Sequence, residues 1–234
     1  MKIEQRYIDA SYLNENPDWD REDAPWKAKM VKELIEKHQI MPSSICEIGC
    51  GSGDILACLI KYYSEVELTG YDVSPQLENF WKEHKDNSRN LNFCVGDFFK
   101  LNTKKYNVLL MLDVFEHVRD PYTFLEMSKQ YADYFVFHIP LDLSASSVVR
   151  EKPLMYTRKK VGHLHSYTKD LALETLKDSG FNIIEWQYTG ASLNMPNRSL
   201  KTILAHMPRK LVYAINKDWG VRLLGGETLL VLAN

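Results

Sequence analysis

The sequence has no apolar run that approaches the roughly 18 residues needed to cross a bilayer. Its first residues, 1–6, are charged and precede no apolar core of a secretory signal peptide, so we expect a chain that is not secreted. It contains only four cysteines, and no two of them are spaced as Cys-x-x-Cys. A disulfide framework is therefore not expected, and a cytoplasmic location is the prediction.

The chain also lacks a strong overall charge, because its formal net charge is −2. Nothing in this balance favours a nucleic-acid partner, and we expect none. The charge is nevertheless uneven, since residues 144–225 contain thirteen Lys or Arg against six Asp or Glu. Such an excess is typical of a solvated face, and it equally suits an anionic small molecule. Apolar residues between these charges allow at most a peripheral membrane contact.

An apolar stretch at residues 45–48 ends in three glycines at alternate positions, Gly49, Gly51 and Gly53. The apolar residues are typical of a buried strand, and a helical pattern starts directly after the glycines. Glycine lets the backbone turn sharply and approach a ligand closely, because it has no Cβ. The helix that follows points its free N–H groups toward the same place. The stretch therefore predicts a nucleotide-binding crevice at the end of a first strand.

From residue 43 onward, apolar strand patterns alternate with helical patterns. The expected strands are 44–49, 66–72, 91–95, 106–112 and 132–139, and the expected helices are 54–63, 75–84, 121–131 and 168–179. This repeat predicts an α/β fold with a doubly wound parallel sheet whose strand ends meet on one side. Two further strands, 181–189 and 226–233, break the repeat and could pair antiparallel at the sheet edge.

We expect a single domain with four parts. Residues 1–40 form an N-terminal helical cover, 43–189 a nucleotide-binding core, 190–225 a helical cap insertion, and 226–234 the final strand. Three aromatic residues of the cover, Tyr7, Tyr12 and Trp19, either pack against the sheet or close over a bound ligand.

Acidic residues end the second and third expected strands. Asp72 follows the glycines at the distance where a carboxylate can accept hydrogen bonds from the hydroxyls of a ribose. Asp97 precedes Phe98, and this pair suits the amino group and ring face of an adenine. The alternatives are a charge at a helix start for Asp72 and a turn residue for Asp97.

The fourth expected strand delivers a dense polar cluster, Asp113, Glu116 and His117, to the same edge of the sheet. Chemistry in open α/β sheets is expected at this edge. Glu47 stands two positions before the first glycine, where its charge would oppose a phosphate and favour a cationic ligand. S-adenosylmethionine is such a ligand, because it carries an ammonium and a sulfonium and no phosphate.

With these stretches in place, the sequence resembles class I S-adenosylmethionine-dependent methyltransferases, in the small-molecule branch that includes ubiquinone-biosynthesis-like enzymes. The resemblance covers about 43–188 and rests on four motifs in order: E-x-G-C-G-x-G, D-x-S, G-D-F and L-D-V-x-E-H-x-x-D-P. It implies a Rossmann-like, seven-stranded, mostly parallel sheet with an antiparallel last strand. It also implies S-adenosyl-L-methionine as cofactor and S-adenosyl-L-homocysteine as product.

The resemblance assigns roles to the motif residues. Asp72 would hold the ribose, Asp97 with Phe98 the adenine, and Leu112 with His117 would border the exit of the methyl group. The full expected cofactor-binding set is Glu47, Gly49, Cys50, Gly51, Gly53, Asp72, Val73, Asp97, Phe98, Leu112, Asp113 and His117.

We expect in-line transfer of the methyl group to an oxygen or nitrogen of a small or medium-sized, anionic acceptor. A base is needed only when the acceptor must lose a proton, and His117 and His165 are the catalytic candidates, with His163 beside the latter. His138 lies in an apolar strand and is expected in the core. We expect no metal site, because the pair His163 and His165 has no Cys or carboxylate nearby at ligand spacing.

Three other functions fit parts of the pattern. An RNA- or protein-modifying methyltransferase fits the basic segment 144–225, although the chain lacks an N/D-P-P-Y/F-type tetrad. A nicotinamide-dependent oxidoreductase fits the fold but not Glu47, the glycine spacing or the G-D-F motif. A cofactor-binding partner without turnover is the third, and the intact motifs argue against it.

Overall fold

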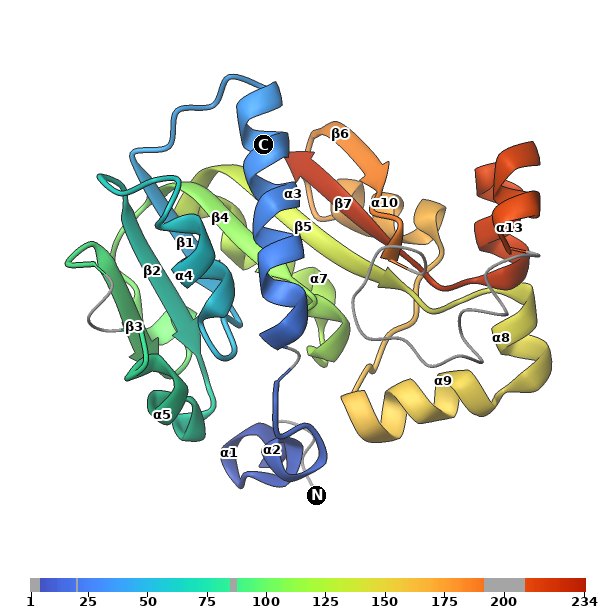
Figure 1. The fold of residues 1–234 in the computed structure, drawn as a ribbon, viewed down its shortest axis with the longest axis horizontal. Coiled ribbons are helices and arrows are strands. Elements are labelled where there is room, and N and C mark those ends of the chain that lie inside the picture. Colours follow the sequence, from blue (N-terminus) through green and yellow to red (C-terminus); the bar gives the residue numbers. More distant parts are fainter. Residues whose placement is uncertain (1–4, 20, 85–87, 192–208) are drawn as a thin grey trace.

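The computed structural model describes residues 5–19, 21–84, 88–191 and 209–234. A seven-stranded sheet of order β3-β2-β1-β4-β5-β7-β6 forms its centre, with helices on both faces (Figure 1). The strands are β1 Ser44–Ile48, β2 Glu67–Asp72, β3 Leu91–Val95, β4 Tyr106–Leu112, β5 Ala132–Leu141, β6 Ile183–Tyr188 and β7 Glu227–Ala233. Only β7 runs antiparallel to its neighbours, β5 and β6. The predicted fold class is confirmed.

Within the described residues, α-helices precede β1 and occupy most of the connections between the strands. They are α1 Gln5–Ile8, α2 Ser11–Glu15, α3 Ala24–Lys37, α4 Asp54–Leu59, α5 Glu78–Trp81, α6 Phe98–Leu101, α7 Pro121–Ser128, α8 Ala145–Arg150, α9 Lys152–Tyr156, α10 Lys169–Asp178 and α13 Lys217–Leu224. Residues 209–215 are also helical. The expected helix 75–84 is shorter, because a 3₁₀ turn, Pro75–Leu77, precedes α5. β5 extends to Leu141, since β7 pairs with it up to that residue.

The strands at the centre of the sheet alternate their apolar side chains between two core layers, as the pleat requires. On β4, Leu109 and Met111 point into the layer beneath α7 and α10, whereas Val108 and Leu110 point into the layer beneath α3 and α4. The strands are apolar on both faces because helices cover both faces. This packing fixes the carboxyl ends of the parallel strands along one edge.

The N-terminal helices α1 and α2 lie beyond the carboxyl ends of the strands, near α9 (Figure 1). The guanidinium of Arg6 donates a hydrogen bond to the carbonyl oxygen of Lys160 at 2.8 Å. The side-chain amide of Asn16 donates to the same oxygen at 3.3 Å. These contacts hold the helices against the π-helical turn Thr157–Val161, which follows α9.

In the expected cap segment, 190–225, helix α13 packs beside α8 (Figure 1). The Tyr213 hydroxyl donates to the carbonyl of Gly225 at 3.1 Å. Val221 is buried, whereas the indole of Trp219 on the same helix is exposed. Residues 192–208 of the expected cap insertion lie outside the described residues. Among the residues that are described, no helix combines the length and apolar character required to cross a membrane.

Candidate active site

The glycine turn between β1 and α4 is held by its surroundings on three sides. The Gly51 N–H donates to a carboxylate oxygen of Asp72 at 3.0 Å, and the Gly51 carbonyl accepts from the Trp81 indole at 2.8 Å. A Cβ on Gly51 would lie 2.7 Å from the indole of Trp19. Because its φ is also +51°, this position requires glycine. The absence of a side chain therefore lets the Trp19 indole pack directly against the turn.

Asp72 ties the end of β2 to the glycine turn. Its second carboxylate oxygen accepts a hydrogen bond from the Ser74 N–H at 2.9 Å, and its side chain is nearly buried. Burial raises the pKa of Asp72 to about 6, although the N–H donors of Ser74 and Gly51 oppose that shift. The carboxylate thus stands beside the turn, where it braces the backbone that the glycines form.

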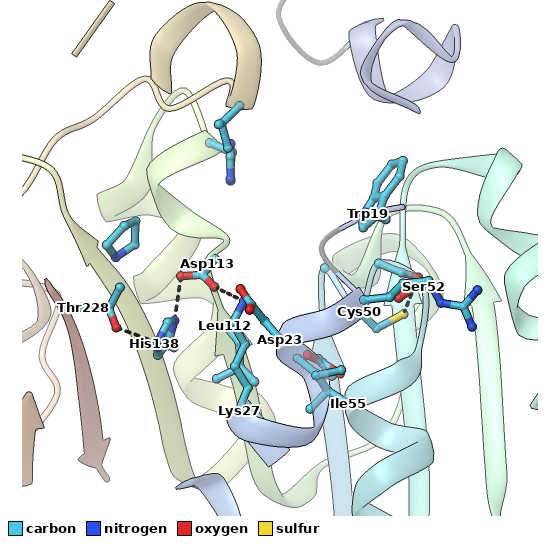
Figure 2. Close-up of a pocket in the computed structure, with 18 of the residues that line it drawn as sticks. Trp19, Asp23, Lys27, Cys50, Ser52, Ile55, Leu112, Asp113, His138 and Thr228 are labelled. Atoms are coloured by element: carbon cyan, nitrogen blue, oxygen red, sulfur yellow. Dashed lines mark hydrogen bonds and ion pairs between the residues drawn. The ribbon is translucent and has the colours of Figure 1, made fainter. Parts of the chain in front are cut away.

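A cavity of about 290 Å³ opens at the carboxyl ends of β1, β4 and β5 (Figure 2). Trp19, Cys50 and Ser52 lie on one side of it, and Leu112 and Asp113 lie on the other (Figure 2). Of the expected cofactor residues, the cavity is lined by Glu47, Gly49, Cys50, Gly51, Leu112, Asp113 and His117. The expected residues that do not line it are Gly53, Asp72, Val73, Asp97 and Phe98.

The residues expected at the adenine end have different environments. Asp97 caps α6, because its carboxylate accepts from the Phe99 N–H at 3.0 Å. The Phe98 ring is 2% exposed and packs edge-on against Tyr71, so it faces the core and cannot cover a ligand in the cavity. Val73, by contrast, is 44% exposed directly after Asp72. Of the two apolar residues expected to bind the cofactor here, Val73 is therefore exposed and Phe98 is buried.

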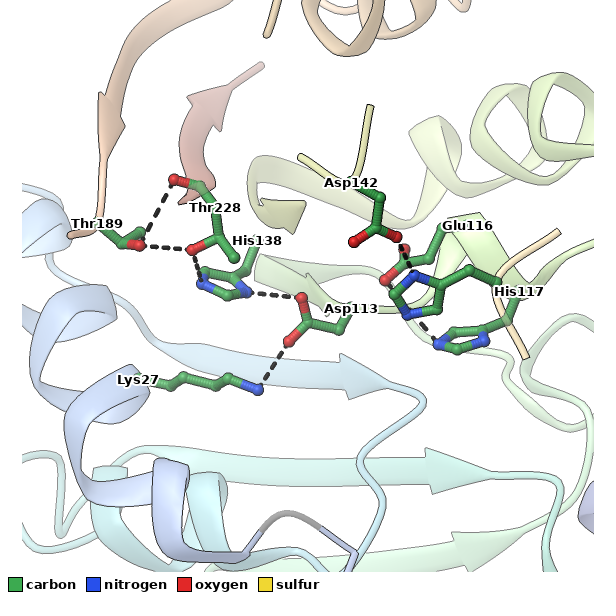
Figure 3. A network of polar contacts seen from close by, with 9 residues as sticks. Lys27, Asp113, Glu116, His117, His138, Asp142, Thr189 and Thr228 are labelled. Carbon is green, nitrogen blue, oxygen red and sulfur yellow. Dashed lines mark hydrogen bonds and ion pairs between the residues drawn. The ribbon is translucent and has the colours of Figure 1, made fainter. Parts of the chain in front are cut away.

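A chain of hydrogen bonds crosses the floor of the cavity (Figure 3). The Lys27 ammonium donates to Asp113 at 2.7 Å, and the other Asp113 oxygen lies 2.7 Å from Nδ1 of His138. Nε2 of His138 lies 2.9 Å from the Thr228 hydroxyl. Burial of the Asp113 carboxylate is outweighed by His138 and Lys27, which hold its pKa well below the usual range. His138 is buried as expected, with both ring nitrogens bonded, but it also lines the cavity.

Replacing Lys27 by methionine is expected to lower the free energy of unfolding by about 2–3 kcal/mol, because the largely buried Asp113 loses a charged hydrogen-bond donor. Urea denaturation measures this change. The control is Lys105→Met, which removes an exposed ion pair with Asp133 and should cost less than about 1 kcal/mol. Equal effects of the two substitutions would contradict a structural role for the Lys27 contact.

A second polar cluster adjoins the first and contains Glu116, His117 and His163 (Figure 3). Nδ1 of His117 lies 3.0 Å from the Tyr7 hydroxyl, and Nδ1 of His163 lies 2.5 Å from Asp142. Burial, with a contribution from the Asp113 charge, raises the pKa of Glu116 to about 8. Burial and the neighbouring His163 lower the pKa of His117 to about 4.

His165, the second expected catalytic residue, lies outside the cavity. Its Nε2 donates to the carbonyl of Val118 at 3.0 Å, and the residue does not line the cavity. His163 lines the cavity instead. The spacing of the two histidines could not decide between them, because the choice depends on backbone hydrogen bonds that residues 164 and 165 donate to Glu116.

Sequence reasoning missed several cavity residues that come from the N-terminal segment and the last strand: Arg21, Asp23, Lys27 and Thr228. Lys27 lies in the first turn of α3, two residues after Pro25. Arg21 forms an ion pair with Asp54, the first residue of α4, at 2.7 Å. No sequence motif predicts that these residues line the cavity, because their positions depend on how the N-terminal segment packs against the sheet.

Comparisons with known proteins agree with this geometry. A family described as a methyltransferase domain matches residues 19–186. The malonyl-[acyl-carrier protein] O-methyltransferase 1 of Ilyobacter polytropus is 28% identical over 120 residues, which are 48% of this chain and 45% of that protein. The match thus spans less than half the length of that relative.

Two solved structures show the same fold at low sequence identity. Magnesium protoporphyrin IX methyltransferase from Synechocystis PCC 6803, bound to S-adenosylhomocysteine, aligns with a TM-score of 0.60, 14% identity and coverage of 89% of this chain and 82% of that one. A chain from the complex of a methyltransferase with the Haloferax volcanii Trm112 activator aligns with a TM-score of 0.64, 16% identity and coverage of 99% and 96%. Identities in this range support the fold alone.

The fold and the glycine turn define the class I methyltransferase architecture, which uses S-adenosylmethionine as its cofactor. The family match covers well over half of the sequence, and the chain belongs to this family of methyltransferase domains. The expected class and the expected cofactor are therefore confirmed at the level of the family.

Proposed function

We propose that the protein transfers the methyl group of S-adenosylmethionine to an oxygen or nitrogen of a small or medium-sized, anionic acceptor. The observation that carries this proposal is one cavity in which the glycine turn meets the polar ends of β4 and β5. A sulfonium donor needs no acid for its leaving group. The protein therefore has to align the acceptor with the methyl carbon and exclude water.

In this assignment the methionine end of the cofactor lies against Glu47, Gly49 and Gly51. The buried Glu47 carboxylate has an oxygen without a hydrogen-bond partner among the described residues, which suits the cofactor's ammonium group. The ribose hydroxyls would bind Asp72, and the adenine would lie along Val73 toward Asp97. These positions follow the order of the strand ends, β1 to β2 to β3, along the sheet edge.

The acceptor would enter on the opposite side, where Leu112 and His117 border the cavity. Tyr12 and Trp19 form its outer wall, and their rings contact each other at a centroid distance of 4.6 Å. An aromatic wall of this kind excludes water from the reacting atoms. The Ilyobacter polytropus relative is named as an O-methyltransferase, which supports an oxygen acceptor. The ubiquinone-biosynthesis-like branch stays part of this proposal.

Calorimetry with S-adenosylmethionine, S-adenosylhomocysteine and NADH tests the cofactor assignment. We expect binding of the first two and none of NADH, and tighter binding of NADH would end the proposal. Incubation of the protein with a labelled methyl donor and cell extract then identifies the acceptor, which we expect to be retained by an anion exchanger. A labelled RNA or protein would overturn the assignment of a small acceptor.

The second candidate function is methylation of a macromolecule. The basic residues of α9 and the turn after it favour it, because this segment leads directly to Val161 and His163, which line the cavity; they are Lys152, Arg158, Lys159 and Lys160. The Haloferax volcanii structure shows a similar chain with a protein activator. Salt-dependent retention of tRNA by the protein would favour this candidate over the first.

Asp72 predicts how cofactor binding depends on pH. Its pKa is raised to about 6, and ribose hydroxyls donate to the ionised carboxylate, so the ligand binds the deprotonated form. We expect the association constant for S-adenosylhomocysteine to be constant above pH 6 and to fall by up to about tenfold per pH unit below it. Titrations from pH 5 to 8 measure this. Asp72→Asn should bind more weakly and show no such dependence, whereas a parallel decline in both proteins would assign the effect elsewhere.

A further inference from the structure

Three potential metal ligands from two distant segments meet at the wall of the cavity. Glu116 and His117 end the 3₁₀ turn after β4, and His163 follows the π-helical turn. One ligating atom from each residue lies within 4.8 Å of the other two. We propose that Glu116, His117 and His163 form a binding site for a divalent transition-metal ion, with Zn²⁺ as the representative ion.

The Glu116 carboxylate is the first argument for a cation. The side chain is 0% exposed, and neither oxygen has a hydrogen-bond partner among the described residues. Burying an ionised carboxylate without a partner is strongly unfavourable, whereas a coordinated cation compensates its charge. The nearest ring nitrogen, Nε2 of His117, lies 3.9 Å away, which is too far for a hydrogen bond and leaves room for an ion between them.

The outer partners of the two histidines are the second argument. His163 presents Nδ1 to the Asp142 carboxylate at 2.5 Å, and His117 presents Nδ1 to the Tyr7 hydroxyl at 3.0 Å. Metal-ligating histidines usually engage their second ring nitrogen with a carboxylate or another polar group, which fixes the ring orientation. Both rings here are held in this way, and the His117 ring also contacts the backbone of Gly162.

Backbone contacts bring the two segments together independently of any ion. The carbonyl of Glu116 accepts hydrogen bonds from the N–H groups of Leu164 at 2.8 Å and His165 at 3.1 Å. Tetrahedral zinc with bonds of about 2.0–2.1 Å places its donor atoms roughly 3.3 Å apart. The three donors therefore have to approach by about 1.5 Å at most, which side-chain rotation supplies.

The donor set defines the class of ion. One carboxylate and two imidazoles suit Zn²⁺ and other first-row ions better than Mg²⁺, which prefers oxygen ligands. Three protein ligands leave a position open, and His117 and His163 both line the cavity. Resting on the proposed function, we assign that open position to an oxygen of the acceptor. The sequence did not predict this site, because Glu116 and His117 lie far from His163 in the chain and come beside it only on folding.

Calorimetric titration of the tag-free protein with Zn²⁺ tests the site in the absence of any methyl donor. We expect one equivalent to bind with a Kd of about 1 µM or lower. The variants Glu116→Gln and His163→Ala should each weaken binding by at least about 100-fold. The control His38→Gln removes a histidine that pairs with Glu185 outside the cavity, and it should bind as the unaltered protein does.

Asp142→Asn provides a variant that keeps all three ligands, and we expect a loss of about 10- to 100-fold in Zn²⁺ affinity. The proposal of a metal site would be overturned if the protein bound no Zn²⁺, Mn²⁺ or Co²⁺. It would also be overturned if the variants of the ligand residues bound Zn²⁺ as tightly as the unaltered protein. The cluster would then be a hydrogen-bonded one with a protonated Glu116. If the protein binds S-adenosylhomocysteine but fails to bind Zn²⁺, only this inference is overturned. If it binds Zn²⁺ but fails to bind S-adenosylhomocysteine, only the proposed function is overturned.

Discussion

Asp72→Ala is expected to weaken the binding of S-adenosylhomocysteine by at least about 100-fold, or about 3 kcal/mol. The substitution removes the acceptor that we assign to the ribose hydroxyls. It also leaves the N–H groups of Gly51 and Ser74 without the carboxylate oxygens that they now contact at 3.0 and 2.9 Å. Calorimetry measures the affinity, and Asp72→Asn, which keeps one oxygen acceptor, should show an intermediate loss.

Loss of affinity has to be separated from loss of stability. The control is Thr168→Ala, which removes the side-chain cap of α10 at a site that does not line the cavity. This variant should lose about 1 kcal/mol of stability and keep its affinity for S-adenosylhomocysteine. An unchanged affinity in Asp72→Ala would show that the ribose lies elsewhere.

Gly51→Ala is expected to lower the affinity for S-adenosylhomocysteine by about 30- to 100-fold, because the new methyl group would lie 2.7 Å from the Trp19 indole. The left-handed backbone at Gly51 adds about 1–2 kcal/mol of strain, so stability should fall as well. Thermal unfolding and calorimetry on the same sample distinguish the two effects.

Gly180→Ala is a matched control for Gly51→Ala. Gly180 also has a positive φ, +86°, and a Cβ there would meet only the end of the flexible Lys129 side chain, at 3.2 Å. The strain is comparable, but the position follows α10 and does not line the cavity. If Gly180→Ala weakened ligand binding as much as Gly51→Ala, the effect would come from general destabilisation and not from the glycine turn.

The sheet could be predicted from the sequence because its signals are local. Apolar runs such as 106–112 are long enough to indicate buried strands, and right-handed crossovers place their carboxyl ends on one edge. For the same reason, the sequence alone brought Gly49, Gly51, Asp113 and His117 to one edge.

The remaining site residues depend on packing between segments that are distant in the chain. Lys27 reaches Asp113 only because α3 begins at the edge of the cavity, and no spacing rule relates the two residues. Phe98 follows the acidic residue that suggested an adenine site, but its ring packs edge-on against Tyr71 within the buried apolar cluster of that face of the sheet. Such packing sets the direction of a side chain at the end of a strand, and the hydrophobic periodicity of the sequence does not predict it.

The docking of α1 and α2 against the turn 157–161 has a consequence for turnover. The Tyr7 hydroxyl contacts His117, Arg6 binds the carbonyl of Lys160, and Tyr12 and Val161 both border the cavity. We expect the spent cofactor to leave past this docking contact, so that some of these contacts break during release. Departure of the product would then be slower than bond formation, as in many enzymes whose loops gate release. The kinetic signature would be a burst of one methylated acceptor per protein molecule, followed by a slower steady rate.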